Sequence, residues 1–411
     1  MKFRNVCLLF FINIIFILSL KTQRVLGYNI PPTINATTAI TVDVDSKDIL
    51  YAKNIDKRMY PASLTKLITA ILLVENRKPS DYLIYSAKAK SQEAVSLNLP
   101  VNSKVLCSDA LDALLLPSAN DIAYMIGENI GGTIPAFANL MNSKVKSLNL
   151  KNTHFVNPNG LPAKNHYSSA YDLSVIAIQL YKYPWIMETM SKEKSVFPVK
   201  NKSNIELINT NILLNKDGNI AGKTGFTTPA GKCLVSFYDR NGRRIVGVVM
   251  NASKGPESDD AFYDMEKIIN WSYKTPKEVL YTKNSLIKNV TLKYKPLIYF
   301  GPIKKISIPI VIKSNVSYYY GNSDLKIETN INKLDIWKLN TNSGIGNLVV
   351  SQREKKVSYN LFSTVSTKNI IYDNFKLYIV FGFTVILIVS IPIFIFAWKK
   401  KRYSHENYIS K

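Results

Sequence analysis

The strongest constraint on the fold of this 411-residue chain is an apolar run that follows Tyr60-Pro61-Ala62-Ser63. In a helix over this run, apolar side chains would lie on nearly all sides, at Leu64, Leu67, Ile68, Ile71, Leu72 and Val74. A helix that is apolar all round is buried in the middle of a domain. Pro61 suits the start of a helix, where a missing N–H is harmless. The sequence therefore predicts a buried helix that begins near residue 61.

Ser63 and Lys66 stand three residues apart in this predicted helix, so they share one face of its first turn. A serine hydroxyl becomes a nucleophile when a neighbouring base takes its proton. A buried lysine with a lowered pKa can be that base, and the free N–H groups at a helix N-terminus can stabilise an oxyanion. Serine and lysine are common, so the pair alone is weak support, and a surface serine beside a solvated lysine is the alternative.

A second pattern, Ser118-Ala119-Asn120, follows a predicted apolar helix at Ala110–Leu116 that ends at Pro117. A turn there places the side chains of Ser118 and Asn120 on the same side of the backbone. The hydroxyl can shuttle a proton, and the amide can bind a substrate backbone. Taken alone, the segment is also an ordinary loop, because serine, asparagine and aspartate are typical of turns.

The third pattern, Lys223-Thr224-Gly225, precedes a predicted hairpin with strands at Cys233–Tyr238 and Arg243–Met250. On an edge strand, a glycine lets a substrate backbone approach closely. The lysine and the threonine present a cation and a hydroxyl suited to a carboxylate. The alternative is a plain strand with an exposed lysine.

Length and charge bound the class of protein. A chain of this length is expected to hold two domains. The net charge of +24 fits attraction to an anionic surface such as a membrane or an acidic wall polymer, but lysines occur throughout the chain, which favours a general compositional bias. We expect no nucleic-acid partner, because no compact basic block with interleaved aromatic residues is present.

Cysteine and histidine usage argues against disulfides and metals. The spacing of Cys7, Cys107 and Cys233 fits no disulfide framework, and we expect Cys107 and Cys233 to be small buried side chains. The three histidines form no metal-ligand motif. We therefore expect neither a metal nor another cofactor.

The sequence predicts a membrane-related segment near each end of the chain and a small domain before the second of them. Residues 1–27 have the charged start and apolar centre of a secretory signal peptide, with an uncleaved anchor as the alternative. Residues 276–368 predict a small all-β domain, because they contain short β-branched runs separated by turn residues. These runs are Ser285–Tyr294, Ile306–Ile312, Val316–Tyr320, Leu325–Ile331 and Leu348–Val350. Residues 377–398 are 22 residues without a charge, about 33 Å as a helix, which is long enough to cross a bilayer. The basic start of residues 399–411 predicts a cytoplasmic tail, with the rest of the protein extracytoplasmic.

The three patterns, in this order and spacing, resemble the motifs of the penicillin-binding proteins and serine β-lactamases. Longer segments resemble the D-alanyl-D-alanine carboxypeptidases within that group, and together they cover about residues 30–275. These segments are Tyr60-Pro61-Ala62-Ser63-x-Thr65-Lys66, Leu115-Leu116-Pro117-Ser118-Ala119-Asn120-Asp121, His154-Phe155-x-Asn157-Pro158-x-Gly160-Leu161, Tyr171-Asp172-Leu173 and Ala230-Gly231-Lys232-Cys233-Leu234.

The resemblance implies an α+β fold of the serine β-lactamase/transpeptidase type in residues 28–275, with a five-stranded antiparallel sheet, helices on both sides and a second, helical lobe. It implies removal of the terminal D-alanine from peptidoglycan stem pentapeptides and covalent binding of β-lactams.

The resemblance also implies a role for each motif residue. Ser63 would be the nucleophile, Lys66 its base and Ser118 a proton relay. Asn120 would bind the substrate amide. Lys223 and Thr224, followed by Gly225, would hold the terminal carboxylate, and the N–H groups of Ser63 and Phe226 would form the oxyanion hole.

Two other functions remain open from the sequence. A β-lactamase shares the three motifs but usually needs a glutamate on the loop after the second one, and residues Asn157–Asp172 contain none. A non-catalytic wall-binding protein would be expected to lack at least one motif residue, and all are present. Endopeptidase activity within the carboxypeptidase family also stays open.

Overall fold

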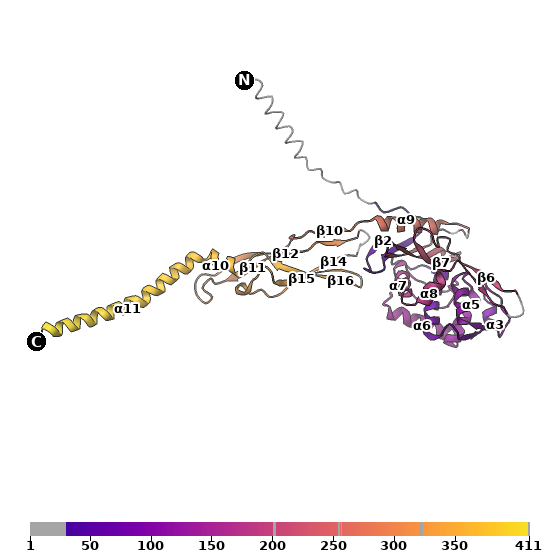
Figure 1. Ribbon diagram of the computed structural model, residues 1–411, viewed down its shortest axis with the longest axis horizontal. Helices are drawn as coiled ribbons and strands as arrows, with labels where there is room; N and C mark the ends of the chain where they lie inside the picture. The colour runs from indigo at the N-terminus through magenta and orange to yellow at the C-terminus, as the bar shows by residue number, and fades with distance from the viewer. Residues whose placement is uncertain (1–29, 200–202, 254, 256, 320–323, 410–411) are drawn as a thin grey trace, which may run out of the picture.

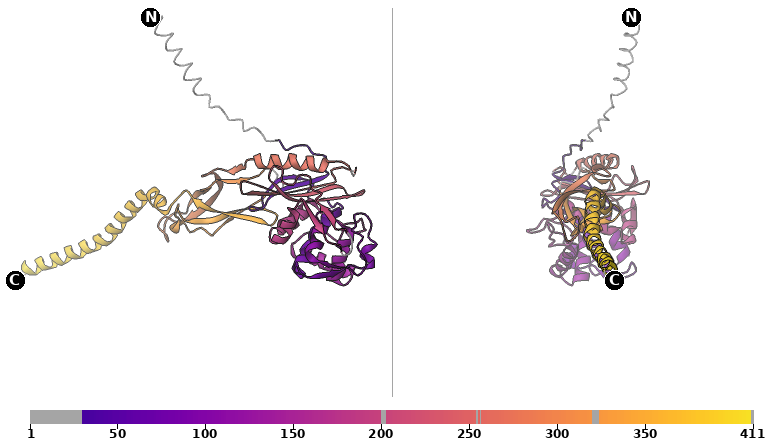
Figure 2. Two further views of the ribbon diagram at one scale, coloured as in Figure 1. Left: turned by 45° about the vertical axis from the view of Figure 1, so that its right-hand side comes forward. Right: turned by 90° about the vertical axis from the view of Figure 1, so that its left-hand side faces the viewer.

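The computed structural model describes residues 30–199, 203–253, 255, 257–319 and 324–409, with side chains up to residue 402. The predicted signal peptide lies outside these ranges. A region of mixed helices and strands (residues 30–275, the N-terminal region) occupies one end of an elongated molecule (Figures 1 and 2). A strand-rich segment (residues 276–366, the β region) follows it, and a long helix extends from the opposite end.

A five-stranded sheet organises the N-terminal region, with strand order β2-β1-β9-β8-β7 and every neighbouring pair antiparallel. This confirms the predicted sheet. Strands β1 and β9, in the middle of the sheet, are rich in the β-branched residues that favour a pleated surface. Their bounds are β1 Thr38–Asp43, β2 Ile49–Lys53, β7 Asn219–Thr227, β8 Gly231–Arg240 and β9 Arg243–Met250.

Helices cover both faces of this sheet, as predicted. Helix α9 (Asp260–Lys274) packs on one face through a core that includes Met265 and Ile269 (Figure 2). A larger core lies between the other face and the remaining helices, with the buried helix α2 in its middle. Those helices are α2 Lys66–Asn76, α3 Ala87–Lys90, α4 Cys107–Leu115, α5 Asn120–Gly131, α6 Ile134–Ser147, α7 Ala170–Leu180 and α8 Pro184–Met190.

Two short hairpins complete the N-terminal region, β3 (Tyr82–Ile84) with β4 (Lys104–Leu106) and β5 (Lys194–Phe197) with β6 (Ile205–Ile208). Cys107 and Cys233 are buried, which confirms the expectation that they are small buried side chains.

The start of the buried helix differs from the prediction. Ser63 lies in a 3-10 turn, η1 (Ala62–Thr65), and the α-helix begins only at Lys66. Ala62 has a φ of +48°, which a regular α-helix does not accommodate. The nucleophile candidate is therefore presented by a sharp turn, with Lys66 at the first position of the helix that follows.

The β region is built on a second five-stranded sheet, of order β11-β12-β16-β15-β14, beside the two-stranded pair β10-β13. It has its own apolar core, which includes Ile308, Ile310, Leu348 and Leu361. The strands are β10 Glu278–Tyr281, β11 Leu286–Tyr294, β12 Lys304–Ile312, β13 Val316–Tyr318, β14 Lys326–Ile331, β15 Gly344–Gln352 and β16 Lys355–Ser363, with the 3-10 turn η2 at Ile336–Lys338.

Two helices end the described chain, α10 (Thr367–Asp373) and α11 (Phe375–Ile409). In α11, residues 375–402 are long and apolar enough to cross a membrane, and their most apolar window is not buried against the rest of the protein. The helix therefore contains the predicted span and extends beyond it at both ends.

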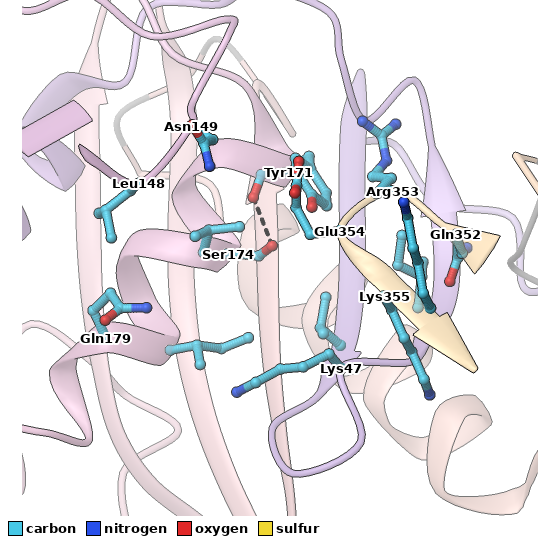
Figure 3. Close-up of a pocket in the computed structure, with 15 residues that line it drawn as sticks. Lys47, Leu148, Asn149, Tyr171, Ser174, Gln179, Gln352, Arg353, Glu354 and Lys355 are labelled. Atoms are coloured by element: carbon cyan, nitrogen blue, oxygen red, sulfur yellow. Dashed lines mark hydrogen bonds between the residues drawn. The ribbon is translucent and has the colours of Figure 1, made fainter. Parts of the chain in front are cut away.

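The β region contacts the N-terminal region through Lys277, Tyr319 and the turn between β15 and β16. Arg353 in this turn donates to Asp56 at 3.0 Å and to Asp324 at 3.0 Å, and its guanidinium lies 4.2 Å from the centre of the Tyr171 ring. Lys355 forms an ion pair with Asp48. A cavity of about 380 Å³ remains beside these contacts, between the turn and helix α7 (Figure 3).

Candidate active site

The first two sequence motifs meet at the side-chain nitrogen of Lys66. Its Nζ lies 2.8 Å from Ser63 Oγ, 2.7 Å from Asn120 Oδ1 and 2.7 Å from the main-chain oxygen of Asn159. The last two oxygens can only accept hydrogen bonds. A neutral lysine would donate its two N–H groups to them and direct its lone pair at the Ser63 hydroxyl, which is the geometry that proton removal from Ser63 requires.

Lys66 is completely buried, and its surroundings favour the neutral form. Burial lowers its pKa well below the usual lysine value, and the positive charge of Lys223 lowers it further, while the negative charge of Asp121 opposes both effects. A lysine that loses its proton more readily is a better base near neutral pH.

Ser118 lies in the turn between α4 and α5, with a φ of +73° that is uncommon for a serine. Its Oγ is buried and has no hydrogen-bond partner among the described residues. A buried, unsatisfied hydroxyl costs free energy. The Ser118 hydroxyl can therefore form a hydrogen bond with a group that enters the site.

Asn120 begins helix α5 and is held from two directions. Its Nδ2 donates to the main-chain oxygen of Glu93 at 2.9 Å, and its backbone N–H donates to that of Val95 at 2.7 Å. The neighbouring Asp121 accepts from the Tyr85 hydroxyl and the Leu97 N–H, both at 2.8 Å. These bonds fasten the segment after α3 to the start of α5. They fix the orientation of the Asn120 amide.

The third motif lies on β7, which is an edge strand of the main sheet, as predicted. Lys223 is buried, its Nζ donates to the main-chain oxygen of Thr224 at 3.0 Å, and burial lowers its pKa to about 7. The hydroxyl of Thr224 lies 2.6 Å from that of Thr210. A Cβ on Gly225 would lie 3.0 Å from the backbone nitrogen of Ser63, so a glycine lets β7 approach η1 closely.

Phe226 follows Gly225 on β7 and pairs with Lys232 of β8 in the strand register. Because Gly225 contacts the turn that holds Ser63, the backbone of β7 and the backbone of η1 run close together at this point. The structure thus brings together Ser63, Lys66, Asn120 and the Gly225 segment of β7, while Ser118 lies two residues before Asn120.

The structure adds contributors that the sequence analysis did not identify. Asn159 acts through its main-chain oxygen, which no side-chain pattern reveals. His166 is buried, its Nε2 lies 2.9 Å from Thr65 Oγ1, and the Val156 N–H donates to its Nδ1 at 3.1 Å. Burial lowers the pKa of His166 to about 4, so it is neutral at pH 7. The sequence pattern that could have drawn attention to this loop is the density of turn residues between residues 154 and 162.

Comparison with known proteins agrees with this fold. Residues 27–254 match the family model of Peptidase_S11, D-alanyl-D-alanine carboxypeptidase. The D-alanyl-D-alanine carboxypeptidase DacF of Bacillus subtilis is 30% identical over 302 residues, 72% of this chain and 77% of that protein. The D-alanyl-D-alanine endopeptidase of Escherichia coli K12 is 32% identical over 226 residues, 54% of this chain and 73% of that protein.

The solved structure of penicillin-binding protein 5 from Haemophilus influenzae matches with a TM-score of 0.58 and 27% identity, over 82% of this chain and 98% of that one. Such coverage exceeds the N-terminal region alone and includes the β region. The fold and these matches define a serine-type hydrolase of the penicillin-binding class. The chain belongs to the D-alanyl-D-alanine carboxypeptidase family.

Proposed function

We propose that this protein removes the terminal D-alanine from peptidoglycan stem pentapeptides through an acyl-enzyme on Ser63. The observation that carries the proposal is the buried Lys66 amine, 2.8 Å from Ser63 Oγ and held by two oxygens that can only accept. A serine–lysine pair with this geometry supports nucleophilic attack on an amide.

In the proposed acylation step, Lys66 takes the proton of Ser63 as the oxygen attacks the carbonyl between the two terminal D-alanines. The N–H groups of Ser63 and Phe226 stabilise the resulting oxyanion. The Ser118 hydroxyl passes a proton to the leaving D-alanine nitrogen as the peptide bond breaks. Water then hydrolyses the Ser63 ester and restores the free enzyme.

In the same proposal, Asn120 hydrogen-bonds the substrate backbone, while Lys223 and Thr224 bind the terminal carboxylate. A carboxylate beside Lys223 would restore the positive charge that burial disfavours. Gly225 leaves room for the peptide to lie along β7. β-Lactams contain a strained amide and a carboxylate, so the same groups would bind them and acylate Ser63.

The test of this function uses the purified protein with a pentapeptide that ends in D-alanyl-D-alanine. Release of free D-alanine and covalent labelling by a fluorescent penicillin are both expected. Ser63→Ala should abolish the labelling and lower D-alanine release by about 10⁴-fold or more, with an unchanged melting temperature. Labelling that persists in Ser63→Ala would contradict the assignment of the nucleophile.

A second measurement separates carboxypeptidase from β-lactamase activity. General-base assistance is worth about 10²–10⁴-fold, and no glutamate is present between Asn157 and Asp172 to assist water. Intact-protein mass spectrometry should therefore show a penicilloyl adduct that persists for minutes or longer while the pentapeptide turns over. Rapid turnover of penicillin without an adduct would favour a β-lactamase.

Endopeptidase activity is a second candidate because a relative of 32% identity is named an endopeptidase. Digestion of cross-linked dimeric stem peptides beside free pentapeptides tests it. Cleavage of the cross-link at a rate comparable with D-alanine release would support the second activity.

We also propose the division of the chain into a signal peptide (1–27), a penicillin-binding domain (28–275), a β domain (276–368), a membrane span (377–398) and a cytoplasmic tail (399–411). Separate apolar cores support the two domains. The unburied apolar helix and the basic residues after it support the span and its orientation.

A further inference from the structure

The turn between β11 and β12 exposes a cluster of large apolar side chains. The exposed fractions are 58% for Ile298, 78% for Tyr299, 69% for Phe300 and 65% for Ile303. Single exposed apolar residues are normal on a protein surface, but a contiguous cluster on one turn marks an interaction site. We call residues 295–303 the apolar turn.

The backbone of the apolar turn has a defined conformation. The Ile298 N–H donates to the main-chain oxygen of Lys295 at 2.9 Å, and the Tyr299 N–H donates to that of Leu297 at 2.7 Å. Ile298 has a φ of +63°, which is costly for a β-branched residue. The chain therefore accepts a strained backbone at the position that presents its apolar side chains to the surroundings.

Hydrogen bonds connect the apolar turn to the start of α11. The Tyr378 hydroxyl donates to the main-chain oxygen of Pro296 at 3.0 Å, and Asn374 Nδ2 donates to the Tyr294 hydroxyl at 2.9 Å. Lys304 Nζ donates to Asn374 Oδ1 at 2.7 Å. Tyr294 and Lys304 are the last strand pair before the turn. The turn thus lies level with the first residues of the apolar helix, at the end of the β domain that faces away from the N-terminal region (Figure 1).

We propose that the apolar turn is a second membrane contact, inserted into the outer surface of the same bilayer that α11 crosses. Aromatic side chains favour the membrane–water interface. Lys295 begins the turn, Lys293, Lys304 and Lys305 flank it, and these lysines would face anionic lipid headgroups. The inference rests on the proposed membrane anchoring by α11. A single helix leaves the protein free to swing, whereas two contacts fix the inclination of the β domain to the membrane.

The test places an environment-sensitive fluorophore on the turn of the full-length protein in vesicles that contain anionic lipid. Phe300→Cys in a Cys7→Ser background provides one reactive thiol, because Cys107 and Cys233 are buried. Leu286→Cys is the matched control. It is an exposed apolar residue on the same strand β11, and the eight residues that separate it from Tyr294 span about 26 Å.

Membrane insertion predicts a blue-shifted emission from the probe at 300 and its loss when nitroxide-labelled lipids are added, with neither change at 286. Equal, water-like emission at both positions would overturn the inference and leave the anchoring by α11 intact. Shielding at 300 that nitroxide lipids do not quench, and that grows with the protein-to-lipid ratio, would assign the turn to a second copy of the chain instead. If the protein fails to float with the vesicles, the anchoring proposal fails, and this inference fails with it.

Discussion

Two residues beside the reactive groups have backbone conformations that ordinary side chains avoid. Ala62 precedes Ser63 with a φ of +48°, and Ser118 has a φ of +73°. Such conformations cost about 1–3 kcal/mol each and persist only where the surrounding structure holds them. Here the holding contacts come from neighbouring elements, because β7 packs on η1 through Gly225. The contacts around the site therefore offset the free-energy cost of these two backbone conformations.

The lowered pKa of Lys223 leads to a prediction about pH. In the proposed mechanism, binding of the substrate carboxylate needs the charged form of Lys223, so kcat/KM should fall as the pH rises above about 7. Activity should also fall at low pH, where Lys66 becomes protonated. Lys223→Arg should move the alkaline fall to a much higher pH, because arginine keeps its charge, even if the activity itself is reduced. The measurement is the pH profile of D-alanine release from a pentapeptide.

An analogue with an amidated C-terminus serves as the control for this prediction. It has no carboxylate, so its residual hydrolysis should not show the alkaline fall that depends on Lys223. The same fall for both substrates would show that Lys223 does not act on the carboxylate.

The side chains of the candidate site could be predicted from the sequence, but the main-chain groups that hold them in place could not. Ser63, Lys66, Ser118 and Asn120 carry chemistry in their side chains, and their spacing is short enough to read directly. By contrast, the main-chain oxygen of Asn159 is 93 residues from Lys66 in the chain. Because every residue has such an oxygen, only the tertiary structure determines which one is used.

At the scale of elements, the loop that contains Gly160 supports the turn that holds Ser63. Gly160 has a φ of +88°, and a Cβ there would lie 1.9 Å from the main-chain oxygen of Ala62. Thr69 Oγ1 donates to the main-chain oxygen of Pro158 at 2.7 Å, which joins the same loop to α2. The loop, η1 and α2 are therefore one packed unit.

We expect Gly160→Ala to lower the melting temperature and to slow acylation by penicillin, because the methyl group must displace the loop from η1. Gly132→Ala is the matched control. Gly132 also has a positive φ, +71°, but no atom lies within 4 Å of a Cβ built there. In Gly132→Ala the free energy of unfolding should fall only by the cost of an alanine at a positive φ, about 1–2 kcal/mol. This variant should keep the wild-type acylation rate. Similar acylation rates in the two variants would contradict the supporting role of the loop.

The prediction of individual strands succeeded for a hairpin of the main sheet and missed two strands of the β domain, one of which has a regular alternation. The hairpin β8–β9 was predicted from its apolar runs and its Asn241-Gly242 turn. Strands β10 and β16 were not predicted. In β16 buried or half-buried residues alternate with lysine, serine and asparagine, and its pairing with β12 and β15 comes from distant sequence. Strands of this kind are defined by their partners more than by local preference.

At the scale of the whole molecule, Arg353 and Lys355 hold the β domain against the N-terminal region. Their partners Asp56 and Asp48 lie on or beside the β2 strand, and Tyr171 begins helix α7. Two further contacts join the same regions: Lys277 pairs with Asp48 at 3.4 Å, and the Arg243 guanidinium donates to the Tyr319 hydroxyl at 3.1 Å. A cavity remains beside the turn (Figure 3). We call this junction, held largely by polar contacts, the hinge.

We predict that Arg353→Ala loosens this hinge without harming catalysis. Loss of partly exposed ion pairs and one cation–π contact should weaken the docking by roughly 1–2 kcal/mol. Small-angle scattering should show a broader range of shapes, and D-alanine release from a soluble pentapeptide should stay unchanged.

Arg244→Ala is the control for the hinge. Arg244 has an ion pair with Asp45 and lies 5.1 Å from the Tyr181 ring, with all three residues inside the N-terminal region. Its loss removes similar interactions but should leave the scattering profile as it is. A changed profile in Arg244→Ala, or an unchanged one in Arg353→Ala, would contradict the assignment of the hinge.

The length of the β domain has a consequence for the choice of substrate. Its longest strands have nine residues, about 30 Å at the usual rise, and they run between the membrane helix and the N-terminal region (Figures 1 and 2). With α11 in the bilayer and the apolar turn on its surface, as proposed, Ser63 would be held at a set height above the lipid. Stem peptides in the glycan layer at that height would be within its reach, and those elsewhere in the wall would lie beyond it.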